Sequence, residues 1–125
     1  MEFRSLMIGT SDSAKLAEFY EKALDQKPES MMPEWYGFKI GQGYLTIGPH
    51  SEVTGTNKEP ARIMFNIETD SPKELFTKIK ATGAEVVKEI GSPDGSDSEE
   101  FLMGTFADPD GNYFQICTKW EEPSK

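Results

Sequence analysis

The sequence predicts an α+β fold in which a unit of one strand, one helix and further strands occurs twice. Apolar residues alternate in segments typical of strands, and two other segments carry the apolar stripe of an amphipathic helix. The two halves superpose at an offset that aligns Asp12 with Ser71 and Leu16 with Leu75. Each unit is too small to bury its own sheet, so we expect two units to pair, within one chain or across a dimer.

The first unit begins with a strand in FRSLMIGT at 3–10, where Leu6 and Ile8 alternate with smaller or polar residues. A helix is predicted in DSAKLAEFYEKAL at 12–24, with Asp12 as its N-cap. Its apolar stripe recurs at helical spacing and consists of Leu16, Phe19, Tyr20 and Ala23.

Two short strands are predicted next, at 35–40 and 44–48. They are separated by the tripeptide GQG, whose glycines can adopt the positive φ that tight hairpin turns require. The polar segment 49–60 is expected to be a linker between the units.

The second unit repeats the pattern with a strand in RIMFNIE at 62–68. The helix that follows has clear end signals. Ser71 is the predicted N-cap, Pro72 stands at the first helical position, Glu74 completes a capping box, and Gly83 marks the end. Its predicted apolar stripe consists of Leu75, Phe76 and Ile79.

Three further strands are predicted in AEVVKEI, FLMGTFA and NYFQICT. The last two are joined by DPDG at 108–111, a composition typical of a tight turn. We predict a single domain over 1–125, made of module 1 (about 1–58) and module 2 (about 59–125).

The net charge of the chain indicates which classes of partner it can bind. The formal net charge is −9 for 125 residues, whereas nucleic-acid binding requires a clustered Lys/Arg surface. We therefore expect no nucleic-acid partner. The segment SDSEE at 96–100 contributes part of the acidity and is expected to be a solvated loop.

No segment approaches the roughly 18 apolar residues of a membrane-spanning helix, and the N-terminal sequence lacks the features of a signal peptide. We expect no membrane partner and a cytoplasmic location. The single cysteine, Cys117, suits a reducing compartment and is expected to be a buried, unreactive thiol.

Alternation along the strands divides the residues between two faces of each sheet. The helices are expected to cover the face of Leu6, Ile8, Leu45, Ile47, Ile63, Phe65, Ile67, Phe114 and Ile116. The opposite face carries small, polar, aromatic and sulfur side chains, which suit a ligand pocket better than a solvent-facing sheet. Its members are Ser5, Met7, Gly9, Tyr44, Thr46, Gly48, Arg62, Met64, Asn66, Tyr113, Gln115 and Cys117. The alternative is that this face only packs against the partner module.

The sequence resembles the vicinal oxygen chelate superfamily, which includes glyoxalase I, extradiol dioxygenases and bleomycin resistance proteins. The resemblance rests on SLMIGTSDSAKLAEFYEKAL, FNIETDSPKELFTKIKATGAEV and, most specifically, FADPDGNYFQI. It implies two βαβββ modules whose curved sheets form a cup with the functional site on the concave face. It also implies that the chain forms a homodimer.

Metal-dependent members of that superfamily place a His on the first strand of each module and carboxylates on the last strands. The corresponding residues here are Ser5, Met64, Thr46 and Gln115, with Arg62 as an alternative if the register shifts. None is a His or a carboxylate. A neutral amide such as that of Gln115 is a poor ligand for a divalent cation and cannot act as a general base. We therefore expect no bound metal, no cofactor and no catalytic residue.

The function predicted from these residues is the binding of a small aromatic or amphipathic compound in the cup, as in bleomycin resistance proteins. Trp35 and Tyr44 would stack on the ligand. The other contacts would come from Ser5, Met7, Thr46, Arg62, Met64, Tyr113 and Gln115. For Gln115 and the aromatic residues, a purely structural role is the alternative.

The second hypothesis is a glyoxalase-type lyase or isomerase, or an enzyme related to the dioxygenases. It would need ligands from elsewhere, such as His50 with Glu52, Glu68 or Asp70, or a reaction without a metal. His50 is the single histidine and is expected to lie exposed in a loop.

Overall fold

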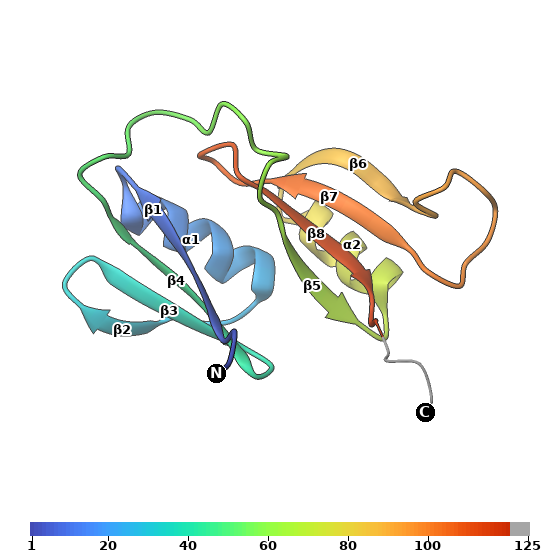
Figure 1. The fold of residues 1–125 in the computed structure, drawn as a ribbon, viewed down its shortest axis with the longest axis horizontal. Helices are drawn as coiled ribbons and strands as arrows, with labels where there is room; N and C mark the ends of the chain where they lie inside the picture. The colour runs from blue at the N-terminus through green and yellow to red at the C-terminus, as the bar shows by residue number, and fades with distance from the viewer. Residues whose placement is uncertain (121–125) are drawn as a thin grey trace. The chain divides into compact units, whose positions relative to one another are not determined.

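A computed structural model describes residues 1–120 of the chain. It divides into two compact units, of which the first is Met1–Thr56 and the second begins at Asn57. Each unit contains one helix and one four-stranded mixed sheet, as Figure 1 shows. The predicted α+β fold of two βαβββ modules is confirmed.

In the first unit the strand order is β1-β4-β3-β2, with β1 parallel to β4 and the other neighbours antiparallel. The second unit repeats this topology as β5-β8-β7-β6. The elements of the first unit are β1 (Ser5–Thr10), α1 (Ser13–Leu24), β2 (Glu29–Met32), β3 (Trp35–Ile40) and β4 (Gly43–Pro49). Those of the second are β5 (Phe65–Thr69), α2 (Pro72–Ala81), β6 (Glu85–Gly91), β7 (Met103–Ala107) and β8 (Tyr113–Thr118).

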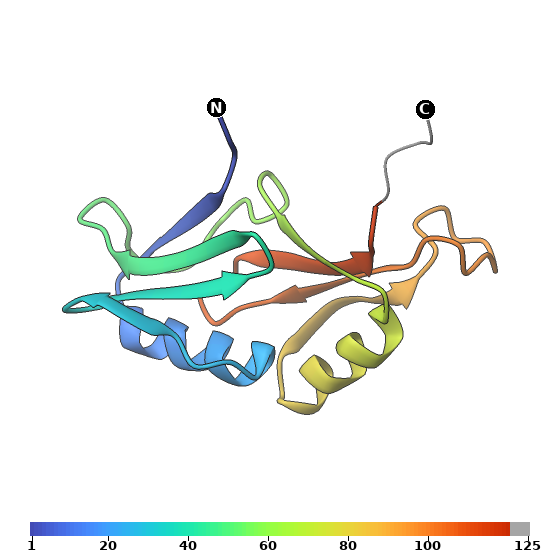
Figure 2. The same ribbon diagram turned by 90° about the horizontal axis from the view of Figure 1, so that it is seen from below.

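Helix α1 covers one face of the first sheet (Figure 2). The opposite face, which no helix of the same unit covers, is called the uncovered face. It begins as predicted, because an Asp12 carboxylate oxygen accepts a hydrogen bond from the Lys15 backbone N–H at 3.1 Å. It ends at Asp25, whose left-handed φ of 50° turns the chain out of the helix. Leu16 and Tyr20 are buried against the sheet, whereas Phe19 is only half-buried.

Helix α2 covers one face of the second sheet in the same way (Figure 2). Pro72 and the positive φ of Gly83 mark its ends as predicted. The predicted capping box is wrong, because the Ser71 side chain makes no cap hydrogen bond and Glu74 pairs with Lys78 instead. The Ser71 backbone N–H donates to the Thr69 hydroxyl at 3.1 Å, so the chain enters the helix through a local turn.

Four stacked phenylalanines hold α2 to its sheet. The ring of Phe76 on α2 lies 4.4 Å from that of Phe106 on β7, measured between centroids. Phe106 lies 5.6 Å from Phe114 on β8, which in turn lies 5.6 Å from Phe65 on β5. Aromatic pairs of this kind add about 0.5–1.5 kcal/mol beyond the area that they bury. Gly104 lets Phe76 approach the sheet, because a Cβ at that position would lie 2.4 Å from the Phe76 ring.

The structure corrects one predicted strand and adds one that was not predicted. The strand predicted at 62–68 begins only at Phe65, so Arg62, Ile63 and Met64 precede the sheet. Ile63 is therefore 72% exposed and not in the core, because the chain before it turns with the Arg62 N–H donating to the Glu59 carbonyl. Strand β2 was not predicted, since its sequence ESMM shows no alternation and all four residues are exposed.

The DPDG turn between β7 and β8 is organised by a buried carboxylate. One oxygen of Asp108 accepts the backbone N–H groups of Asp110 at 2.9 Å and Asn112 at 3.0 Å. The segment predicted as a linker is fixed to this turn at its end, because the Asn57 N–H donates to the Asp110 carbonyl at 2.8 Å. The Asn57 side-chain amide also donates to the Asn112 side chain at 3.0 Å.

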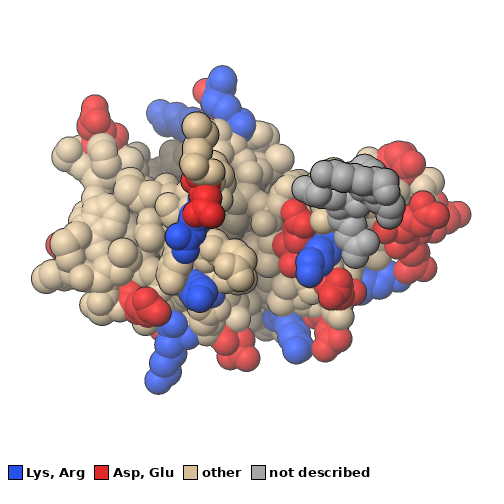
Figure 3. Space-filling model, turned by 60° about the horizontal axis from the view of Figure 1, so that its bottom comes forward, with Lys and Arg blue, Asp and Glu red and all other residues tan. Residues whose placement is uncertain are grey.

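None of the helices in the described part of the chain is long and apolar enough to cross a membrane. On the face drawn in Figure 3, acidic and basic side chains are interspersed, and the described atoms there form no continuous basic patch.

Candidate functional site

The uncovered face of the first sheet gathers the residues predicted there. In the pairing of β1 with β4, Ser5 lies beside Tyr44 and Met7 lies beside Thr46. Cross-strand neighbours share a face, so these four side chains lie together opposite α1. Met7 is 50% exposed, which is unusual for a large apolar side chain on a strand.

The indole of Trp35 lies on the same face, directly over Gly48. A Cβ at position 48 would lie only 2.2 Å from the ring, so no larger residue fits beneath it. Met31 lies over Gly37 in a similar way, with its sulfur 3.1 Å from the position that a Cβ would take. Two glycines thus allow an aromatic and a thioether side chain to lie flat on the sheet. Such side chains suit contacts with a planar apolar compound.

In the second unit Gln115 lies in the middle of the uncovered face. Its strand neighbours are Asn66 on β5 and Thr105 on β7, which form one polar row across the sheet. The Gln115 amide nitrogen donates to the Thr105 hydroxyl at 3.1 Å. This bond orients the amide, and its oxygen remains available as a hydrogen-bond acceptor within the part of the chain that the structure describes.

Arg62 and Tyr113 are brought together at one side of this unit. They line an open cavity of about 480 Å³ at the surface with Glu59, Pro60 and Ala61. Tyr113 shares the uncovered face with Gln115, two residues further along β8. The prediction that Met64 shares this sheet face is wrong, because Met64 precedes β5. Its side chain is 37% exposed.

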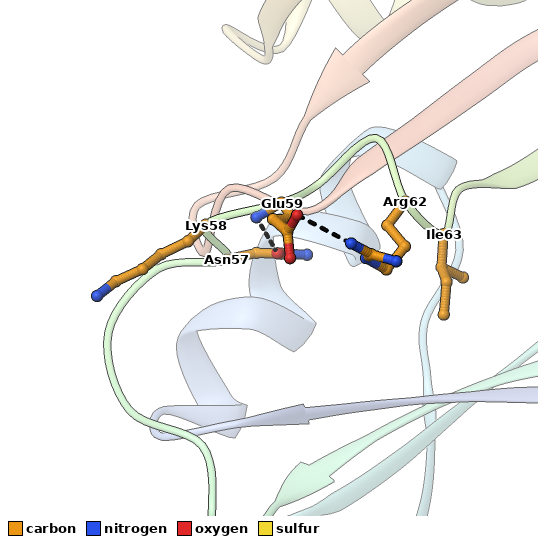
Figure 4. A pocket seen from close by; sticks show the side chains of 5 residues that line it. All are labelled: Asn57, Lys58, Glu59, Arg62 and Ile63. Carbon is orange, nitrogen blue, oxygen red and sulfur yellow. Dashed lines mark hydrogen bonds and ion pairs between the residues drawn. The ribbon is translucent and has the colours of Figure 1, made fainter.

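A second cavity of about 290 Å³ lies on the same segment and is drawn in Figure 4. It shares Glu59 and Arg62 with the first cavity, and these two side chains point toward each other in an ion pair at 3.0 Å. The Lys58 side chain extends away from the pair. The backbone N–H of Glu59 donates to the Asn57 side-chain oxygen at 3.0 Å, which fixes the start of this segment.

The sequence model of the family described as a glyoxalase-like domain matches residues 5–117 of the chain, from β1 to β8. The chain belongs to the glyoxalase-like family. This places it in the vicinal oxygen chelate superfamily that the sequence resembles.

Solved structures agree with this assignment of the fold. The glyoxalase-like chain superposes on a glyoxalase/bleomycin resistance protein from Albidiferax ferrireducens T118 with a TM-score of 0.70 and 17% identity, covering 94% of this chain and 98% of that one. A glyoxalase-related enzyme from Fulvimarina pelagi gives a TM-score of 0.70 at 18% identity, with 98% and 93% covered. A hypothetical protein from S. aureus is 26% identical, with a TM-score of 0.65 and 95% and 97% covered. The comparison with curated proteins finds no match.

Metal-dependent members of the superfamily hold a metal ion, and the donor set of this chain does not fit one. Gln115 uses its amide nitrogen on Thr105, and the Thr46 hydroxyl contacts the Leu6 carbonyl at 3.5 Å. Met64 precedes its strand, and Ser5 is exposed. Hydroxyl, thioether and amide groups are weak ligands for Zn²⁺, Ni²⁺ or Mg²⁺ when no carboxylate or imidazole joins them.

Two of the alternative metal ligands considered for a glyoxalase-type enzyme, His50 and Glu68, have other partners. His50 is exposed as predicted, and its Nδ1 accepts the Glu52 backbone N–H at 3.1 Å. A Glu68 carboxylate oxygen accepts the Trp120 backbone N–H at 2.8 Å. Among residues 1–120, no three His, Cys, Asp or Glu side chains gather in a way that could hold a metal ion.

Cys117 is buried in β8, as predicted. Burial raises the pKa of its thiol above the ordinary value, and the neighbouring Glu68 carboxylate raises it further. A raised pKa lowers the thiolate fraction at neutral pH, so this cysteine is a poor nucleophile.

Three cavity-lining residues, Glu59, Pro60 and Ala61, and the Gln115 partner Thr105 were not predicted. The first three lie in or beside the polar segment predicted as a linker, and their position depends on contacts with a turn about 50 residues away in sequence. No local pattern signals such contacts. Thr105 could have been found, because alternation along β7 places it on the same face as Gln115 once the hairpin is assumed.

Proposed function

We propose that this glyoxalase-like protein binds a small aromatic or amphipathic compound on the uncovered faces of its sheets, without a metal. The observation that supports this most is the composition of each face. Half-exposed Met7 and Trp35 share the face of Thr46 in the first unit, and Gln115 contributes a neutral polar group in the second. An apolar lining with a few oriented polar groups is typical of small-molecule sites.

The aromatic preference follows from the first unit. Trp35 lies flat over Gly48, and Tyr44 extends the same face on the neighbouring strand. Planar side chains in this arrangement present ring faces to a ligand at low cost in conformational entropy. Ser5 and Thr46 add hydroxyl groups that can orient the ligand.

The protein acts by holding the ligand and not by reacting with it, because the residues at the expected metal positions can neither activate water nor move a proton. We further propose that the protein is a cytoplasmic homodimer. The single cysteine suits a reducing compartment. Small modules can pair across a dimer as well as within one chain, and size-exclusion chromatography with light scattering tests the dimer.

The binding site is tested by filling it. A panel of aromatic and amphipathic compounds is screened by thermal shift, and the tightest binder is titrated by calorimetry. Gln115→Trp and Thr46→Trp are expected to lower its affinity at least about tenfold, because a new indole on the uncovered face occupies the ligand's volume. Thr77→Trp, on the exposed side of α2, is the matched control and should bind normally. Unchanged affinity in the first two variants, with folding intact by circular dichroism, would remove the proposal.

A further inference from the structure

We infer that the ligand carries a carboxylate next to an aromatic ring, with Arg62 binding the carboxylate and Tyr113 packing on the ring. This inference rests on the proposed function and names the ligand class that the second unit selects. It starts from the cavity of about 480 Å³ that both side chains line. Ligand cavities in proteins commonly measure about 300–1,000 Å³.

The guanidinium of Arg62 has hydrogen-bond donors that remain available to a ligand. A guanidinium carries five N–H donors, and among the described residues the side chain of Arg62 donates one hydrogen bond, to Glu59 at 3.0 Å. The remaining donors can form the two parallel hydrogen bonds by which arginine recognises a carboxylate. The side chain is 70% exposed, so an incoming anion reaches it without opening the fold.

The segment that lines the cavity carries more cations than acids, although the chain as a whole does not. Asn57–Ile63 contains the cations Lys58 and Arg62 and the single acid Glu59, in a chain with a formal net charge of −9. Lys58 points away from the ion pair (Figure 4), so Arg62 is the cation that faces the cavity. Glu59 competes with a ligand carboxylate for the same guanidinium. Its removal should therefore strengthen binding.

The aromatic ring of the ligand is inferred from the other residues that line the cavity. Tyr113 offers a half-buried aromatic side chain, and Pro60 and Ala61 add apolar surface. Gln115 lies two residues further along the same face of β8, which is about 7 Å at the usual rise of a strand. A polar substituent on the far side of the ring could thus reach the Gln115 amide oxygen.

Benzoate and its neutral analogue benzamide provide the probes. Each is titrated into the full-length ¹⁵N-labelled protein, with binding followed by ¹H–¹⁵N spectra. Benzoate is expected to bind with a dissociation constant of about 1 mM, as its few atoms allow, and at least about tenfold more tightly than benzamide. The largest shifts should fall at Arg62 and Tyr113.

Variants separate a designed site from a general attraction of charge. Arg62→Gln should weaken benzoate about tenfold and leave benzamide unchanged, whereas Glu59→Gln should strengthen benzoate about threefold. Lys58→Gln is the charge-matched control for Arg62→Gln and should have little effect. Equal weakening by Lys58→Gln and Arg62→Gln would overturn the inference, as would equal binding of the two probes or no binding of benzoate.

These outcomes are distinct from failure of the proposed function. If benzoate binds through Arg62 but the Gln115→Trp and Thr46→Trp variants bind the panel compounds normally, the carboxylate site stands and the proposed function falls. If only neutral aromatic compounds bind, and Gln115→Trp removes them, the proposed function stands and the carboxylate inference falls.

Discussion

Replacing Phe106 with Ala is expected to lower the free energy of unfolding by about 3–5 kcal/mol. Phe106 is fully buried and lies between Phe76 and Phe114 in the stack that joins α2 to the second sheet. Its removal loses the transfer energy of a phenyl group and leaves a cavity that the two flanking rings cannot fill without moving. Urea unfolding followed by circular dichroism measures the change.

Phe65 is the matched control for this experiment. It stands at the end of the same stack and is only half-buried, so Phe65→Ala should cost clearly less than Phe106→Ala. Equal losses in the two variants would show that the stack is not centred on Phe106.

Gly104→Ala is expected to destabilise the protein by about 1–3 kcal/mol, although it adds a single methyl group. The new Cβ would lie 2.4 Å from the Phe76 ring and 3.1 Å from the Ile90 Cα. Phe76 cannot move aside easily, because it is 2% exposed and stacked on Phe106. The same urea experiment measures the loss.

Gly91, in the strand beside β7, provides the comparison. No atom lies within 4 Å of the position that its Cβ would take, and its φ is not in the left-handed region. Gly91→Ala should therefore leave the stability nearly unchanged or raise it slightly, since alanine restricts the unfolded chain. A destabilisation as large as that of Gly104→Ala would contradict the assignment of strain to the Phe76 contact.

The repeated fold could be predicted because its signals are local. Asp12 marks a helix start through its side-chain cap, and Gly83 marks a helix end through its positive φ. The alternation of Leu45 and Ile47 marks a strand directly. The predicted capping box at Ser71 failed because Thr69, two residues earlier, takes the Ser71 N–H first. Competing local hydrogen bonds of this kind are difficult to rank from sequence alone.

In the candidate site, too, local patterns were predicted correctly and tertiary contacts were not. On β1, β4 and β8 the alternation places Met7, Thr46 and Gln115 on the uncovered face as predicted. Arg62 and Met64 were assigned to a strand face by extending the alternation of β5 backwards, but the chain turns at Glu59 and the strand begins later. The turn is fixed by Asn57 and the distant DPDG loop, so tertiary contacts decide it.

The proposed absence of a metal is consistent with the donor chemistry at four positions of the fold. A glyoxalase-type reaction needs an electrophile and a base, and Ser5, Thr46, Met64 and Gln115 supply neither. Metal analysis of untagged protein, purified without chelator and then incubated with Zn²⁺, Ni²⁺, Mn²⁺ and Fe²⁺, should find well below one ion per chain. A stoichiometric ion would direct attention to an enzyme with unconventional ligands.

The most direct test of the binding function maps a bound compound onto the backbone. The tightest binder from the aromatic panel is titrated into ¹⁵N-labelled protein, and the amide shifts are assigned to β1, β4, β8 and the two helices. We predict saturable shifts on these three strands, with the solvent-facing residues of α1 and α2 unchanged. Shifts confined to the helices, or the absence of any binder in the panel, would contradict the proposed function.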